Sequence, residues 1–120
     1  MASWNDVDAL CRRLPDAVLG QAHEGSPAWY AGRHQFARLR WDEQDRELVQ
    51  LWTGEMDTAQ VLSGRRDTFP VVHTFRFRVS LWAVLGELDS RELTELILES
   101  YGCRGGARRL AAVDTEALLS

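Results

Sequence analysis

The fold is decided by residues 27–53, which read PAWYAGRHQFARLRWDEQDRELVQLWT. This stretch contains two strand-like runs, 34–41 and 47–53, on either side of the polar turn 42–45. Within the first run two sets of residues alternate: Ala37, Leu39 and Trp41 against Phe36, Arg38 and Arg40. Because successive side chains of a strand point to opposite faces of its sheet, one face is predicted to be apolar and the other to carry two guanidinium groups. The stretch therefore predicts an antiparallel hairpin with a cationic face.

Length and composition are those of an ordinary globular domain. The chain has 120 residues, of which 45% are apolar and 27% are charged, which is enough for one hydrophobic core. We expect a single domain over 1–120, with its core at about 4–104 and a helical C-terminal tail at 105–120. The formal net charge of −4 argues against a generally basic nucleic-acid binder but permits a local basic patch. All 14 basic residues are arginine, which excludes a lysine nucleophile or Schiff base.

The cysteines and the apolar runs carry no special signal. Cys11 and Cys103 lie on apolar helical stretches and form no CxxC pair, so both are expected to be free, buried thiols. The first residues include early acidic side chains and lack a positive segment followed by an apolar one, which does not match a secretory signal. No apolar run approaches the roughly 20 residues of a membrane span. We therefore expect a cytoplasmic protein with no membrane partner.

The rest of the chain alternates helical and strand patterns. Ser3, with Asp6 three residues later, is expected to cap a first helix that Pro15 ends. Asp89 and Glu92 predict the start of a long last helix. Further strands are expected at 17–22, 28–31 and 75–85, and a short helix at 56–62. The predicted class is α+β with two layers: an antiparallel sheet, with about four strands in a meander plus a later strand, covered by helices.

Short motifs in a fixed order along the chain resemble those of the MmcQ/YjbR family. They are Leu14-Pro15, His23-Glu24-Gly25-Ser26-Pro27, the segment from Gly32 to Ala37, Pro70 to His73, Trp82, and Ser100-Tyr101. The resemblance extends over about residues 4–110, and Arg33 supplies the charge that a lysine supplies in the family. It implies a compact YjbR/CyaY-like α+β fold and a double-wing mode of DNA binding. It brings no catalytic residues.

The first candidate site is a nucleic-acid surface on the cationic strand faces. Guanidinium groups bind phosphates in a bidentate manner, and exposed aromatic rings stack on unpaired bases. The candidate residues are Arg33, Arg38, Arg40, Arg76 and Arg78, with Trp52 and Trp82 for stacking. The alternative is a solvated or tail-covered face, with its arginines paired to Glu47, Glu55 or Glu87.

The second candidate is a small-molecule- or protein-binding pocket at the aromatic end of the sheet. Its residues would be Trp29, Tyr30, His34 and His73, and ordinary packing of large rings is the alternative. The sequence contains no HExxH-type metal motif, nucleophile elbow or phosphate loop, so we expect no metal, no cofactor and no enzymatic activity. The predicted function is therefore a non-enzymatic binding protein of the MmcQ/YjbR type. DNA is the expected partner, and the sequence leaves monomer and homodimer equally open.

Overall fold

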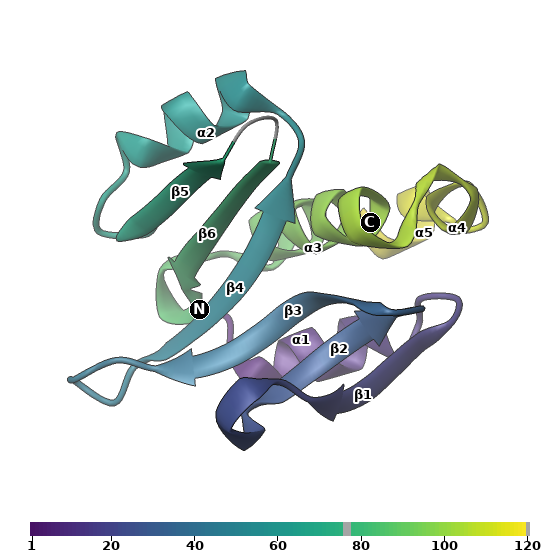
Figure 1. The fold of residues 1–120 in the computed structure, drawn as a ribbon, viewed down its shortest axis with the longest axis horizontal. Helices are drawn as coiled ribbons and strands as arrows, with labels where there is room; N and C mark the ends of the chain where they lie inside the picture. The colour runs from purple at the N-terminus through teal and green to yellow at the C-terminus, as the bar shows by residue number, and fades with distance from the viewer. Residues whose placement is uncertain (76–77, 120) are drawn as a thin grey trace.

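The computed structural model describes residues 1–75 and 78–119 as an α+β domain (Figure 1). Six strands form one antiparallel sheet in the order β1-β2-β3-β4-β6-β5. The strands are β1 (Ala17–Gln21), β2 (Pro27–Ala31), β3 (His34–Trp41), β4 (Glu47–Thr53), β5 (Val71–Phe75) and β6 (Arg78–Val84). The helices are α1 (Trp4–Cys11), α2 (Met56–Ser63), α3 (Ser90–Gly105), α4 (Ala107–Ala111) and α5 (Thr115–Leu119), with 3₁₀ turns at His23–Gly25 and Leu85–Glu87. The predicted class, helices covering an antiparallel sheet, is confirmed, although the sheet has one strand more than the sequence indicates.

The predicted caps are present at the starts of α1 and α3. The backbone N–H of Ser3 donates to the Asp6 carboxylate at 2.9 Å, and the Asp89 carboxylate accepts from the backbone N–H of Glu92 at 2.7 Å. Such bonds satisfy N–H groups that have no partner inside the helix. The sequence therefore fixes where both helices begin.

The helices share one apolar core with one face of the sheet. Val7 of α1, Leu62 of α2 and Ile97 of α3 belong to the same buried cluster as Val49 of β4 and Leu81 of β6. In Figure 1, α1 and α3 lie together behind the sheet. The opposite face carries a second, small apolar cluster, to which no helix of the described residues contributes: Leu48, Trp82 and Val84.

The run 75–85, predicted as a single strand, is divided between two strands. β5 ends at Phe75, β6 begins at Arg78, and these two residues are antiparallel partners. The alternation of apolar and polar residues continues through the connection because both strands have the same period of two. No glycine, proline or asparagine marks the turn in the sequence. The single-strand prediction is wrong, and β5 is instead an edge strand beside β6.

A β-bulge in β3 decides which face Phe36 occupies. The register of β2 and β3 shifts after the pair of Trp29 and Ala37, which leaves Phe36 as the extra residue. The bulge allows Phe36 and Ala37 both to be fully buried, although they are neighbours in the chain. The Phe36 ring packs against the Tyr101 ring with centroids 5.2 Å apart. The prediction that Phe36 shares a face with the strand arginines is therefore wrong.

A buried serine of α3 joins β3 to β4 at the point where their ladder ends. Pairing of the two strands stops at Arg38 and Gln50. Beyond this pair, the fully buried Ser100 hydroxyl donates to the Phe36 carbonyl and accepts from the Trp52 backbone N–H at 3.0 Å. Figure 1 shows the two strands diverging here, with α3 behind the opening. We call this opening the β3–β4 split.

The segment expected as a helical tail folds back as α4 and α5. Gly106, with φ of 94°, separates α3 from α4. The Leu110 side chain then packs so closely on α3 that a Cβ at Gly102 would lie 2.6 Å from it. Val113 and Leu118 are partly buried against the main core.

Candidate functional site

The face of the sheet opposite the helices is here called the open face. Its side chains are assigned by strand register, because cross-strand partners share a face. They are Arg38 and Arg40 of β3, Leu48, Gln50 and Trp52 of β4, Arg78, Ser80, Trp82 and Val84 of β6, and Val71 and His73 of β5. The face is thus arginine- and tryptophan-bearing, as the sequence indicates.

Arg38 fixes the His23–Gly25 turn against the sheet. Its Nε donates to the Ser26 hydroxyl at 3.1 Å, and its Nη2 donates to the His23 carbonyl at 3.2 Å. Its Cζ also lies 5.9 Å from the ring centroid of Trp82. Arg38 is therefore partly committed to a structural role, with neutral oxygens as its acceptors.

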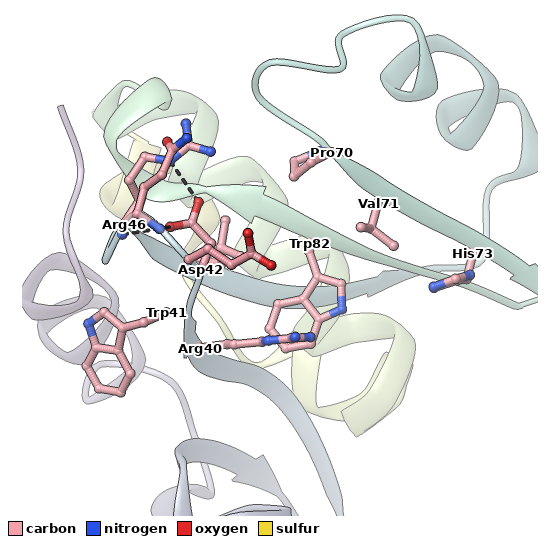
Figure 2. A pocket seen from close by; sticks show the side chains of 11 residues that line it. Arg40, Trp41, Asp42, Arg46, Pro70, Val71, His73 and Trp82 are labelled. Carbon is pink, nitrogen blue, oxygen red and sulfur yellow. Dashed lines mark hydrogen bonds and ion pairs between the residues drawn. The ribbon is translucent and has the colours of Figure 1, made fainter.

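Arg40 is the strand arginine with the most available charge. Its Cζ lies 5.4 Å from the Trp82 ring centroid, and Figure 2 shows its side chain lying across that ring. Within the described residues it has no hydrogen-bond or ion-pair partner, and its side chain is exposed. Trp82 is only 8% exposed, so the guanidinium and not the indole is the accessible surface. A guanidinium stacked on a ring keeps its N–H donors free for an anion.

A concave site of about 660 Å³ opens beside Arg40 (Figure 2). Its apolar part includes Leu48, Trp82 and Val71, and His73 lies at its far end. This volume falls within the range of about 300–1,000 Å³ typical of small-molecule sites. The site therefore combines an apolar base, a stacked cation and a titratable ring.

The hairpin side of this site carries acidic groups. Asp42 forms an ion pair with Arg46 at 2.8 Å, and Glu43 lies on the same rim. Hydrogen bonds from the Arg46 backbone, together with its side chain and the Gln44 backbone, lower the pKa of Asp42. The rim at the β3–β4 turn thus carries one ion pair and the Glu43 carboxylate, whereas the Arg40 guanidinium lies on the strand side.

A second hollow, of about 750 Å³, adjoins the first. It is lined by residues 23–27 of the 3₁₀ turn and by the end of β3. Both hollows include Arg40 and Trp41 among their lining residues, so they meet at the end of β3. We call the two hollows together the Arg40–Trp41 groove.

Trp41 lies on the sheet face that the sequence pattern predicts, because it pairs with Glu47, but it is not buried there. The alternation places it on the apolar core face, yet its side chain is 51% exposed. It is the last residue of β3, in the hairpin that projects from the body of the sheet in Figure 1, beyond the reach of the helices. A large exposed ring at the end of an alternating run, next to a turn, is the signal that would have found it.

Arg38, Arg40 and Arg78 are not paired with glutamates in the part of the chain that the structure describes. Glu47 instead accepts from the Trp4 backbone N–H at 3.1 Å. Within 1–75 and 78–119, no ion pair includes Arg38, Arg40 or Arg78.

Three of the other predicted nucleic-acid residues, Arg33, Arg78 and Trp52, lie away from this groove. Arg33 is exposed in the turn between β2 and β3, and Arg78 is exposed at the start of β6. Trp52 lies under Arg104 of α3, whose Cζ is 4.7 Å from the ring centroid. Arg76 lies outside the described residues.

The four residues of the predicted aromatic pocket are not brought together. Trp29 is buried in the main core, where its Nε1 donates to the Asp8 carboxylate at 2.7 Å. The Tyr30 hydroxyl donates to a β1 carbonyl at 2.8 Å. His34 lines a small cavity at the β3–β4 split, and His73 lines the large concave site. The four residues lie on three strands, β2, β3 and β5, and have separate surroundings, so their packing does not form one pocket.

Three other predictions from the sequence concern metal binding, the two thiols and membrane crossing. There, no three His, Cys, Asp or Glu side chains are grouped so as to hold a metal ion. Cys11 is buried and free, whereas Cys103 is exposed, so the prediction that both thiols are buried is wrong for Cys103. That residue lines the small cavity at the β3–β4 split. None of the described helices has both the length and the apolar composition needed to cross a bilayer.

Comparison with known proteins identifies the fold. No protein-family model and no curated protein matches the chain. Among solved structures it is similar to the crystal structure of Deinococcus radiodurans protein DR2400, a DUF419 domain. The two share 15% identity with a TM-score of 0.67, over 95% of this chain and 91% of that chain. At this identity the similarity supports the fold alone.

Proposed function

We propose that this protein is a non-enzymatic binding protein that holds single-stranded DNA in the Arg40–Trp41 groove. The observation that carries the proposal is the Arg40 guanidinium, which is stacked on Trp82 and has no acidic partner among the described residues; the exposed Trp41 is the next residue of β3. A phosphate group pairs with such a guanidinium, and an unpaired base stacks on such a ring whatever its sequence.

The charges around the groove decide which way the phosphates and the bases of a bound DNA strand face. Asp42 and Glu43 lie on the hairpin rim, whereas Arg38 and Arg40 lie on the strand side. Because like charges repel, the phosphates pass along the arginines and the bases face Trp41. This arrangement is consistent with a net charge of −4, since the attraction is local.

We also propose that the protein is of the MmcQ/YjbR type. The ordered motifs support this assignment, and so does the fold, because DUF419 is related to the YjbR-like fold. DNA as the partner comes from the sequence resemblance, and the choice of a single strand comes from the exposed ring.

A salt titration of DNA binding tests the proposal. The affinity for a labelled oligonucleotide, followed by fluorescence anisotropy, is expected to fall with salt with a log–log slope of roughly −0.7 per phosphate contact. Arg40→Gln is expected to reduce that slope by about one contact. Trp41→Ala is expected to weaken binding by on the order of tenfold or more, because stacking on one aromatic ring contributes about 1–3 kcal/mol.

Arg12→Gln is the matched control. It removes one positive charge from an exposed position at the end of α1, in the helix layer. Its binding is expected to equal that of the wild type. Absence of binding at low salt, equal losses in Arg12→Gln and Arg40→Gln, or preference for duplex over single strand would each contradict the proposal.

A second candidate function is the binding of a small planar ligand. The concave site of about 660 Å³, with its apolar base and His73, favours it. A ligand specific for the native state raises the melting temperature. We expect a metabolite of this kind to stabilise the wild type but not His73→Ala. No stabilisation by any planar metabolite would reject this candidate.

A further inference from the structure

A small cavity lies at the β3–β4 split, outside the Arg40–Trp41 groove. Its volume is about 110 Å³, and it is lined by His34, Trp52, Arg78, Cys103 and Arg104. At about 30 Å³ for each water molecule, this space holds roughly three or four waters or one small ion. It is too small for a nucleoside.

Two guanidinium groups converge on the cavity from different elements. Arg104 comes from the last turn of α3, and Arg78 is the first residue of β6. Burial and, next, the nearby Arg78 cation lower the pKa of Arg104. Like charges brought together at a partly buried position repel, and an anion placed between them removes that repulsion.

Arg104 is held in place while its terminal nitrogens remain available. Its Nε donates to the Gln35 carbonyl at 2.9 Å, and its guanidinium lies over Trp52. Within the described residues, neither its terminal nitrogens nor the Arg78 guanidinium have a hydrogen-bond or ion-pair partner. Ser100 anchors α3 at the same split. The donors are therefore preorganised, which reduces the entropy lost on binding.

Among the described residues, no carboxylate forms an ion pair with either arginine. Glu99 lies close enough to raise the pKa of Cys103, although burial is the larger cause. Its Oε1, however, accepts from the Thr53 hydroxyl at 2.9 Å, and it forms no ion pair with either arginine among the described residues. The cavity thus keeps a net positive charge.

We propose that this cavity, the Arg78–Arg104 site, binds one phosphate group. Guanidinium forks match the oxygens of a tetrahedral oxyanion, and the His34 ring supplies a further donor. The chemistry is shared by inorganic phosphate, a small phosphoester and a nucleic-acid phosphate. The site does not depend on DNA binding in the groove, because free phosphate is enough to occupy it.

A nuclear magnetic resonance titration tests the site. Sodium phosphate is added at constant ionic strength, with sodium chloride as the reference, while the Trp52 indole N–H and the Arg104 Nε–H are followed. We expect saturable shifts with phosphate and none with chloride. Arg78→Gln is expected to weaken phosphate binding by about tenfold or more, since it removes charge-assisted hydrogen bonds, and Arg12→Gln to leave it unchanged.

The variants are chosen so that the result does not depend on folding. Arg104→Gln would also remove the bond to the Gln35 carbonyl, whereas the Arg78 side chain is exposed and makes no such bond. Non-saturable shifts, equal shifts in chloride, or equal phosphate affinity in folded Arg78→Gln would overturn the proposal.

Competition with oligonucleotides identifies the source of the phosphate. Displacement by a strand with a 5′-hydroxyl indicates a backbone phosphate, and displacement only by a 5′-phosphorylated strand indicates a terminal one. If neither displaces it, the ligand is inorganic phosphate or a small phosphoester; each of these results supports the site. A wild-type protein that binds DNA but not phosphate would refute this site alone, and one that binds phosphate but not DNA would refute the groove proposal alone.

Discussion

Replacing the buried serine that bridges β3 and β4 tests how the sheet is held open. The Ser100 hydroxyl donates to the Phe36 carbonyl and accepts from the Trp52 N–H. Ser100→Ala removes both of these hydrogen bonds at once without adding volume. We expect the fold to survive with reduced stability, because α3 keeps its apolar contacts with the core.

The magnitude follows from the two backbone groups that lose their partner. Leaving one buried polar group unsatisfied costs about 1–3 kcal/mol, so two such groups predict a loss of about 2–6 kcal/mol. For a domain of this size, that is a large part of the total stability of about 5–15 kcal/mol. Relaxation of the β3–β4 split, which lets water reach the two backbone groups, places the loss of stability at the lower end of this range.

Urea unfolding followed by tryptophan fluorescence measures this loss. The midpoint is expected to fall with the slope m unchanged, since the surface exposed on unfolding stays the same. Ser63→Ala is the control, because its hydroxyl donates to a backbone carbonyl in an exposed helix end and its loss is expected to stay within about 0.5 kcal/mol. A similar small change for Ser100→Ala would show that the hydroxyl does not hold the two strands.

Two further outcomes concern the open face and the thiols. Gln50→Met is expected to leave stability unchanged or to raise it by about 1–3 kcal/mol, because the Gln50 side-chain oxygen is buried without a partner; a clear loss in thermal unfolding would contradict this. In thiol labelling of the native protein, Cys103 is expected to react and Cys11 only after unfolding. Burial raises the pKa of Cys103, so its labelling is expected to be slower than that of a free thiol and to accelerate as pH rises; equal rates for both thiols would refute the burial pattern.

Local sequence signals predict the parts of the fold that depend on local chemistry. The caps at Ser3 and Asp89 mark real helix starts, and the alternation over 34–41 and 47–53 marks a real hairpin. These signals work because a cap or a strand period depends on residues a few positions apart.

The missed features depend on partners far away in the sequence. No glycine marks the bulge at Phe36, which forms because the ring packs on Tyr101 of α3. The connection between β5 and β6 likewise lacks turn residues. The Arg78–Arg104 site needs the β3–β4 split, which exists only because α3 inserts Ser100 between the strands. Strand alternation predicts that Arg40 lies on the cationic face. No local pattern in the sequence predicts that Arg104 lies over Trp52.

The five tryptophans provide the most direct measurement of where DNA binds. Their indole N–H signals report on separate places: Trp4 and Trp29 in the main core, Trp41 and Trp82 at the groove, and Trp52 at the phosphate site. On addition of single-stranded DNA, we predict that the Trp41 and Trp82 signals shift in a saturable manner while those of Trp4 and Trp29 stay in place. Unchanged signals at Trp41 and Trp82, or larger shifts at Trp4 and Trp29, would contradict binding at the open face.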